Sequence, residues 1–146
     1  MIIVLALMTA TSLLAKPYNR MRLAKLRRYA NNGQSGAQYE LGRRYQYGTG
    51  LPKKYDLAIL WYEKAAKNGN VAAMNELGFL YYNGRGVKRD YAIALMWFTK
   101  AANKGNRIAQ YNVAWCFAYG YGADKDYKKA FYWAKKSAAN KYGSGQ

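Results

Sequence analysis

The chain has 146 residues, 51% of them hydrophobic and 16% aromatic, so it can bury a packed core and is not expected to be disordered. Lys and Arg outnumber Asp and Glu by 24 to 7, and the formal net charge of +17 favours anionic partners. Because the chain has no histidine, a serine or cysteine triad would lack its usual general base and a zinc site its commonest ligand, so the composition argues against an enzyme and predicts no metal and no cofactor.

The N-terminal segment, residues 2–15, is uncharged and mostly apolar, and Lys16 and Pro17 follow it at once. Fourteen helical residues span about 21 Å, which is short of the roughly 30 Å hydrocarbon core of a membrane. The run has the length of a signal-peptide hydrophobic region, with cleavage after Ala15. We predict that residues 1–15 are the signal peptide of a periplasmic or secreted protein; the alternatives are an uncleaved membrane anchor and an apolar cap on the fold.

A basic segment follows at residues 16–33. Its residues 28–33 align with residues 64–69 of the repeat described next, so residues from about Asn19 to Asn32 are expected to form the single remaining helix of a preceding repeat and to cap the fold. A basic amphipathic helix of this kind suits an anionic membrane surface and equally a solvated helix face. The charged residues concerned are Arg20, Arg22, Lys25 and Arg27.

A 36-residue repeat covers most of positions 37 to 138 and is the strongest pattern in the chain. The first half of each copy has apolar residues spaced by four, which places them on one face of a helix. It ends at two glycines separated by one residue, and because glycine tolerates left-handed backbone, each pair predicts a helix-ending turn. In chain order these residues are Ala37, Leu41, Tyr45, Gly48 and Gly50; Ala73, Leu77, Tyr81, Gly84 and Gly86; and Ala109, Val113, Phe117, Gly120 and Gly122.

The second half of each copy predicts a second helix, in which small alanines let a neighbouring helix approach and a Trp fills the remaining gap. The residues are Ala58, Trp61 and Ala65; Ala94, Trp97 and Ala101; and Ala130, Trp133 and Ser137. Side-chain oxygens are expected to cap the helices of copies two and three, at Asn70 and Asn106 for the first helices and at Asp90 and Asp126 for the second. Copy one has Lys54 in the Asp position, which predicts a less firmly started helix with Asp56 as a substitute cap.

One helix hairpin cannot bury its apolar face alone, whereas stacked hairpins share a continuous core. The predicted fold is therefore all-α: a solenoid of about three antiparallel helix-hairpin repeats, at residues 34–69, 70–105 and 106–142, with a short tail to residue 146 and residues 16–33 as an N-terminal capping helix. Leu41, Tyr45, Ala58 and Trp61, with their copies, are the predicted core.

Written as a string, the repeat is A-x-x-x-L-G-x-x-Y-x-x-G-x-G-V-x-x-D-Y-x-x-A-x-x-W-[YF]-x-K-A-A-x-x-G, with its best copy from Ala73 to Gly105. It closely resembles the Sel-one-like repeat, a relative of the tetratricopeptide repeat, over about three quarters of the chain. The resemblance implies a right-handed superhelix of antiparallel helix pairs that serves as an adaptor for protein complexes, often in bacterial envelope, secretion or signalling settings. It implies no catalytic residues.

Two features of the sequence bear on catalysis, and neither supports it. A cysteine-rich branch of the family has been linked to β-lactam hydrolysis, but its repeats carry paired cysteines and this chain has only Cys116. A β-lactam hydrolase is therefore only a remote alternative to the adaptor function. Glu40 and Glu76 share one repeat position, and in a basic solenoid such carboxylates are expected to neutralise nearby Lys or Arg instead of acting as an acid–base pair.

First-helix positions at which the repeats differ are the candidate partner contacts, because the first helices of related solenoids line the concave surface. Three rows of such positions are predicted to floor a groove, with aromatic and Arg residues of the types enriched at binding hot spots. The rows are Tyr39, Asn75 and Tyr111; Arg43, Phe79 and Trp115; and Tyr47, Asn83 and Tyr119. For Phe79 and Trp115, packing between neighbouring hairpins is an equal alternative. The expected partner is a protein or peptide, an acidic one being favoured, and no small-molecule substrate is expected.

Basic residues also recur at the repeat period and form two ladders along the stack: Arg28, Lys64, Lys100 and Lys136, and Lys53, Arg89 and Lys125. The first set lies in the last turns of the second helices, where a cation meets the negative end of the helix dipole. The ladders suggest the alternative function, a binder of anionic surfaces such as a membrane or an acidic glycan. Single-stranded nucleic acid ranks third, because no nucleic-acid-binding motif accompanies the charge.

Overall fold

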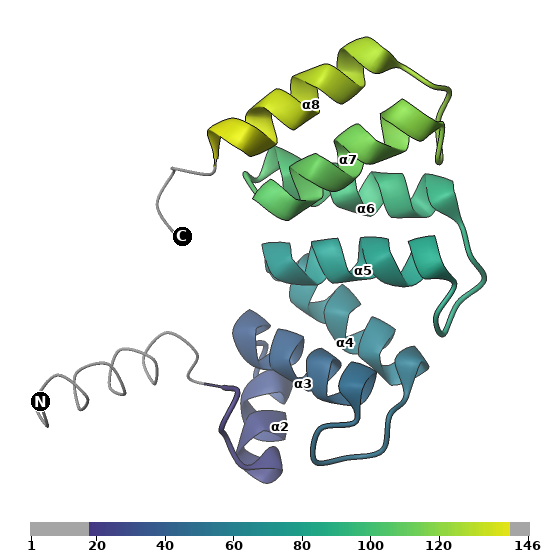
Figure 1. Ribbon diagram of the computed structural model, residues 1–146. Coiled ribbons are helices and arrows are strands. Elements are labelled where there is room, and N and C mark those ends of the chain that lie inside the picture. Colours follow the sequence, from purple (N-terminus) through teal and green to yellow (C-terminus); the bar gives the residue numbers. More distant parts are fainter. Residues whose placement is uncertain (1–17, 141–146) are drawn as a thin grey trace, which may run out of the picture.

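The computed structural model describes residues 18–140, in which seven helices and no strand are found (Figure 1). A short helix, α2 (Leu23–Asn31), comes first, and three hairpins of 13-residue helices follow it. The hairpins are α3 (Ser35–Tyr47) with α4 (Tyr55–Lys67), α5 (Val71–Asn83) with α6 (Tyr91–Asn103), and α7 (Arg107–Tyr119) with α8 (Tyr127–Ala139). The prediction of an all-α helix-hairpin solenoid is confirmed, whereas the predicted leader, residues 1–15, lies outside the described residues.

The helix caps agree with the sequence. Asn70, Asp90, Asn106 and Asp126 each accept a hydrogen bond from the backbone N–H three residues later, at 2.8–3.0 Å. Lys54 occupies the cap position of α4, and no side-chain hydrogen bond caps that helix. The substitute proposed from the sequence, Asp56, lies inside the first turn, where its charge still favours the positive end of the helix.

In repeats two and three, the second glycine of the turn has a packing role that the sequence did not predict. Gly48, Gly84 and Gly120 end the first helices in left-handed backbone, as expected. A Cβ atom at Gly86 would overlap Tyr55, and one at Gly122 would overlap the backbone of Tyr91. Each of these turns therefore sits against the start of the second helix of the preceding repeat, which fixes one hairpin on the next.

The large buried ring is not the expected one. Trp61, Trp97 and Trp133 pack against the buried core residues, but they are only partly buried and are not the ring that fills the core as predicted. In the first two repeats the residue after Trp does so instead: Tyr62 and Phe98 are almost fully buried, whereas the third repeat has the exposed Ala134 at this position. Each ring lies against a glycine of the first helix. A Cβ atom at Gly42 would come within 2.7 Å of the Tyr62 ring, and one at Gly78 would overlap the Phe98 ring.

The N-terminal end of the stack is closed by α2, whose Leu26 and Ala30 are buried with Ala37 and Leu41 of α3. Arg44, also on α3, is buried, and its guanidinium donates hydrogen bonds to the backbone carbonyls of Tyr18, Asn19 and Met21 at 3.3, 3.1 and 2.7 Å. The α2 helix begins at Leu23, later than the expected Asn19, because the segment before it runs as turns held by this guanidinium.

Candidate binding surface on the first-helix face

The predicted groove residues all lie on the first helices of the hairpins, α3, α5 and α7, which form one row across the stack; we call their shared outer surface the first-helix face (Figure 1). Side chains join neighbours in this row. The Gln46 amide on α3 donates to the carboxylate of Glu76 on α5 at 3.4 Å, and the Asn112 amide on α7 donates to the Asn75 side-chain oxygen on α5 at 3.2 Å. The face is therefore continuous from the first repeat to the third.

The structure leaves most of the predicted groove residues accessible to a partner. Those that are exposed are Tyr47, Asn83, Tyr111, Trp115 and Tyr119, and those that are partly buried are Tyr39, Arg43 and Phe79. The prediction for Asn75 is wrong. This residue is only 5% exposed, because its side chain packs between α5 and α7, and it therefore cannot line the groove. Phe79 was predicted either to line the groove or to pack between hairpins, and it does both. Its ring centroid lies 5.2 Å from that of buried Phe98, and the residue also lines the pocket at the surface.

The part of the face between α3 and α5 is polar, and its groups are already engaged with one another. Glu40 accepts hydrogen bonds from Arg43 at 3.3 Å and from Arg44 at 3.4 Å, which is the neutralising role expected for it. Arg43 also lies over the Tyr47 ring, at 5.8 Å. An incoming ligand would have to compete with these contacts.

Glu76 lies at the junction of α3 and α5. Burial raises the pKa of its carboxyl above the ordinary value, and the hydrogen bond from Gln46 and the nearby charge of Arg43 offset part of that rise. Gln46 is in turn held by the hydroxyl of Tyr62, whose own pKa is raised by burial. The Glu76 carboxylate is thus engaged by an amide that is itself held by the protein.

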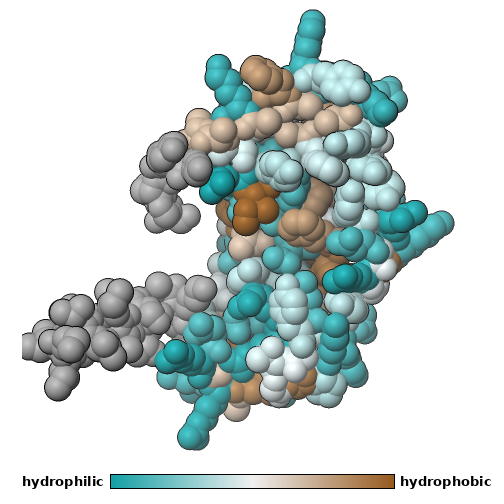
Figure 2. Space-filling model, in the orientation of Figure 1, coloured by the Kyte–Doolittle hydropathy of each residue, from teal (hydrophilic) through white to brown (hydrophobic). Residues whose placement is uncertain are grey.

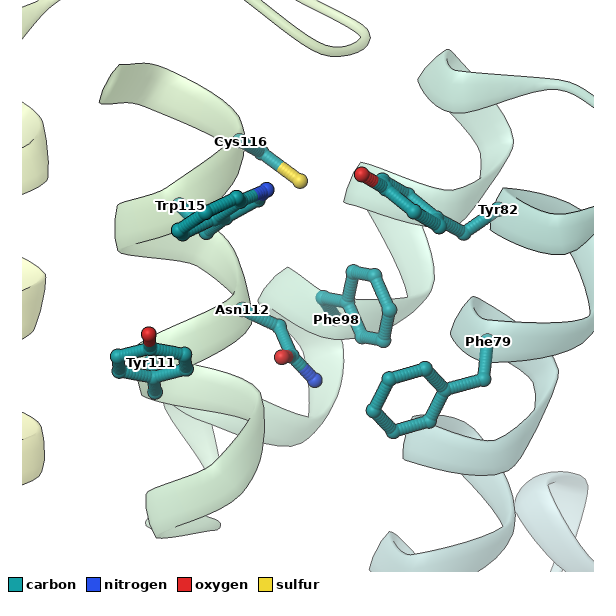
Figure 3. A pocket seen from close by; sticks show the side chains of 7 residues that line it. All are labelled: Phe79, Tyr82, Phe98, Tyr111, Asn112, Trp115 and Cys116. Carbon is teal, nitrogen blue, oxygen red and sulfur yellow. The ribbon is translucent and has the colours of Figure 1, made fainter. Parts of the chain in front are cut away.

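Between α5 and α7 the face is instead aromatic and hollowed. A pocket of about 340 Å³ lies here, and Figure 3 shows the rings of α5 facing those of α7 across it, with a ring of α6 behind. Its lining is Phe79, Tyr82, Phe98, Tyr111, Asn112, Trp115 and Cys116. Figure 2 shows hydrophobic side chains gathered in this region, between α5 and α7, on a face that is otherwise largely hydrophilic.

The aromatic lining continues beyond the pocket as a connected set of rings. Trp115 and Tyr119 have ring centroids 4.2 Å apart, Tyr119 and Tyr121 are 6.3 Å apart, and Tyr121 lies 5.5 Å from Tyr82 on α5. At the inner wall, burial raises the pKa of the Cys116 thiol to about 11, so it is protonated and unreactive at neutral pH. The pocket thus offers ring faces and one amide, Asn112, and no charged side chain.

Sequence reasoning missed the inner-wall residues Phe98 and Cys116, and it also missed three outer side chains of this surface, Tyr82, Asn112 and Ile108. Tyr82 and Asn112 line the pocket, and Ile108 is 59% exposed on the same helical stripe as Tyr111 and Trp115. The signal was present, because all three stand at positions where the repeats differ. Ile108 aligns with Gly36 and Ala72, Tyr82 with Gln46 and Ala118, and Asn112 with Glu40 and Glu76.

The positive charge is concentrated away from this face. The helices α3, α5 and α7 together contain only three basic residues, Arg43, Arg44 and Arg107. The members of both predicted ladders are exposed. Several lie over aromatic rings: Lys64 over Trp61 at 4.3 Å, Lys100 over Trp97 at 4.5 Å, Lys136 over Trp133 at 5.2 Å, Arg28 over Tyr29 at 5.6 Å, Lys53 over Tyr55 at 5.0 Å and Arg89 over Tyr91 at 5.1 Å. Cation–π contact therefore explains most of the periodicity, and Lys125 has no such contact among the described residues.

Two further features of residues 18–140 bear on function. No helix in this part of the chain is both long enough and apolar enough to cross a lipid bilayer. Among the same residues, no three His, Cys, Asp or Glu side chains come together as a group that could hold a metal ion.

A stack of equivalent helix hairpins with a variable exposed face defines a helical-repeat protein. Three copies of the Sel1 repeat are recognised, at residues 35–70, 71–106 and 107–142, and the chain belongs to the Sel1 repeat family. Proteins of this family typically serve as scaffolds for protein–protein interaction and are generally non-catalytic.

Solved structures agree with this assignment. A Sel1 repeat protein from Oxalobacter formigenes is 39% identical, with a TM-score of 0.74, over 81% of this chain and 89% of that one. A protective antigen present in uropathogenic Escherichia coli strains, which displays an SLR fold, is 35% identical with a TM-score of 0.77 over 79% of this chain; the match spans 25% of the antigen. No curated protein matches the chain.

Proposed function

We propose that this protein is a non-catalytic scaffold that binds a partner protein or peptide on its first-helix face, with an apolar side chain of the partner entering the pocket between α5 and α7. The observation that carries the proposal is the pocket itself, whose rings stay open to the surface and whose volume of about 340 Å³ suits one large side chain. Exposed aromatic rings around such a pocket are the residue types that dominate binding hot spots.

The segregation of charge supports a neutral contact in this pocket. Arg43 is partly buried and is paired with Glu40 on α3, away from Trp115 on α7. Arg107 is exposed in the first turn of α7 but does not line the pocket. Nothing in the pocket selects an acidic side chain, so the acidic partner favoured by the net charge does not follow for this site. A partner with an aromatic or aliphatic anchor fits the lining better.

The cellular setting is part of the same proposal. Residues 1–15 have the features of a signal peptide. The two similar proteins of known structure described above come from bacteria. We therefore propose that the scaffold acts in the bacterial periplasm or outside the cell. Its proposed parts are the leader, the capping segment 16–33 and the repeats 34–69, 70–105 and 106–142. Determining the N-terminal residue of the mature protein tests this part, and a retained Met1 would contradict export by cleavage.

The binding proposal is tested with a displayed library of 12-residue peptides, selected on the purified protein and then measured individually by isothermal titration. Trp115→Ala removes a hot-spot ring and should weaken the selected peptides about 30-fold, the equivalent of roughly 2 kcal/mol. Tyr132→Ala is the matched control, because Tyr132 is also an exposed ring but lies on α8. Equal affinity for Trp115→Ala and the wild type, or loss of helical circular dichroism in the variant, would contradict the proposal.

A second candidate, a binder of anionic surfaces, is favoured by the exposed ladders Arg28, Lys64, Lys100 and Lys136, and Lys53, Arg89 and Lys125. An anionic membrane or an acidic glycan would contact these residues, and nucleic acid ranks behind both. Salt separates the candidates, since affinity for a polyanion falls steeply and log-linearly with salt concentration whereas a peptide held by ring contacts loses much less. Heparin and the selected peptides, titrated over the same salt range, give the comparison.

A further inference from the structure

The last second helix, α8, exposes the side that its counterparts bury. Ile59 of α4 and Leu95 of α6 are 7% and 9% exposed, while Phe131, the equivalent residue of α8, is 71% exposed. The same holds for the small residues of this side: Ala66 and Ala102 are buried in α4 and α6, and their equivalent in α8 is exposed. We call this surface the α8 end face; it consists of Tyr127, Phe131, Ala134 and Ala138, all exposed.

The first two repeats show what kind of structure covers such a face. Ile59 and Leu95 belong to one core cluster with residues of the next hairpin's first helix. Those residues are Ala73, Met74 and Leu77 of α5 and Ala109 and Val113 of α7. The glycine turns at Gly86 and Gly122 complete the contact at the start of the second helix. The equivalent surface of α8 therefore has the shape of a seat for a helix with a stripe of small and aliphatic side chains.

The charge around the α8 end face selects the occupant. The α8 sequence contains four lysines and no acidic residue, and the nearest carboxylate, Asp126, already pairs with Lys129 at 3.7 Å. The opposite end of the stack is basic too: α2 carries Lys25, Arg27 and Arg28 and no acidic residue. A second copy, whether joined α8 to α8 or α8 to α2, would bring like charges together, which disfavours self-association.

We propose that the α8 end face binds an amphipathic helix of a partner protein, with small and aliphatic residues in its apolar stripe and Asp or Glu along both edges. The apolar stripe would continue the packing of the three hairpins, and the acidic edges would meet the α8 lysines. This surface is separate from the pocket between α5 and α7, so the proposal does not depend on the function assigned to the first-helix face. An anionic membrane has less use for the small Ala134 and Ala138 beside Phe131, which suit a helix packed closely against α8.

The probe is a synthetic peptide with the sequence of residues 71–105, in which its exposed Arg85, Lys88, Arg89, Lys100 and Lys104 are replaced by Glu, so that it resembles the next repeat with acidic edges. Because one hairpin cannot bury its apolar face alone, the peptide is expected to gain helix as it binds, which circular dichroism of the mixture follows. Binding to the full chain is followed by isothermal titration. Phe131→Ser should weaken binding at least tenfold. Tyr132→Ser is the matched control and should leave it unchanged, because Tyr132 is 52% exposed at a position where Leu60 and Met96 of the covered helices are also exposed, at 43% each.

Two further measurements complete the test. A hairpin with Gln at the same five positions should bind at least about tenfold more weakly than the Glu form, and the difference should shrink as salt rises. Trp115→Ala should not change hairpin binding, which separates this proposal from the one for the pocket. The proposal is overturned if the Glu hairpin does not bind, or if Phe131→Ser and Tyr132→Ser weaken its binding equally. It is also overturned if Phe131→Ser abolishes binding to phosphatidylglycerol vesicles but not to the hairpin. A dimer in sedimentation that Phe131→Ser dissociates would likewise overturn it.

Discussion

The first and third repeats have the same backbone arrangement but present opposite kinds of surface. In the first, Arg44, Glu40 and Gln46 are buried and engaged by polar contacts within the protein. In the third, Trp115 and Phe131 are exposed rings with no comparable cover. The shared positions of the repeat place the helices, whereas the variable positions decide whether a surface is closed or is left available to a partner.

A single repeat position illustrates this difference. Arg44, Leu80 and Cys116 are equivalent and all buried. Arg44 holds the N-terminal segment through three backbone carbonyls, while Cys116 contributes to the wall of the aromatic pocket. Substitutions in one repeat at a time measure how much of this contrast depends on the changed residue.

The largest effect is expected from Arg44→Leu, which gives the first repeat the residue of the second. The variant loses three charge-assisted hydrogen bonds and leaves Glu40 with one partner, so the free energy of unfolding should fall by about 3 kcal/mol. Urea denaturation measures the loss, and hydrogen exchange should show that α2 loses protection first. Arg44→Lys is the control: it keeps the charge without the fork of donors and should be intermediate. Unchanged stability of Arg44→Leu would mean that these contacts do not hold the cap.

A smaller loss is expected from Gly42→Ala, which introduces a Cβ against the fully buried Tyr62 ring. Overpacking should lower the free energy of unfolding by about 2 kcal/mol, even though Ala is the better helix former by about 1 kcal/mol. The third repeat has Ala114 in this position and Ala134 in place of the ring. In a Tyr62→Ala background, Gly42→Ala should therefore become stabilising by about 1 kcal/mol. The same sign in both backgrounds would contradict the steric explanation.

The smallest effect concerns the helix start that distinguishes the first repeat. Lys54 has the backbone conformation of the capping residues Asp90 and Asp126, with φ near −145° in all three, but offers no acceptor. Lys54→Asp should raise the free energy of unfolding by about 1 kcal/mol, and Asp126→Ala should lower it by a similar amount. Thermal denaturation of the two variants measures both changes. A loss of stability in Lys54→Asp would show that the position cannot be capped.

The repeat period, the turns and the four caps could all be read from the sequence, because each depends on residues that are neighbours along the chain. The identity of the buried ring could not. Trp61 and Tyr62 are adjacent and both aromatic, and only the approach of Gly42 on the partner helix decides that Tyr62 is buried. Repetition made the fold predictable, since three copies of one pattern agree; it carried no information on which neighbouring side chain would face the core.

The binding surface was predictable only in part, for a related reason. Choosing variable first-helix positions found Trp115, Tyr111 and Phe79. It also chose Asn75, because the sequence does not show that α5 and α7 come close enough for Asn112 to bond to it. The pocket depends on side chains from two repeats at once, so no single copy of the pattern contains it.

The contact of Gly122 with the backbone of Tyr91 has a consequence for how such an array can diverge. A joint made of main-chain atoms contributes to the angle between these two hairpins, beside the side-chain core that they share. Substitutions on the outward positions then change the chemistry of a surface while leaving the pitch of the array as it was. Related proteins can therefore exchange one binding partner for another by point mutation, while the spacing between contact points stays unchanged.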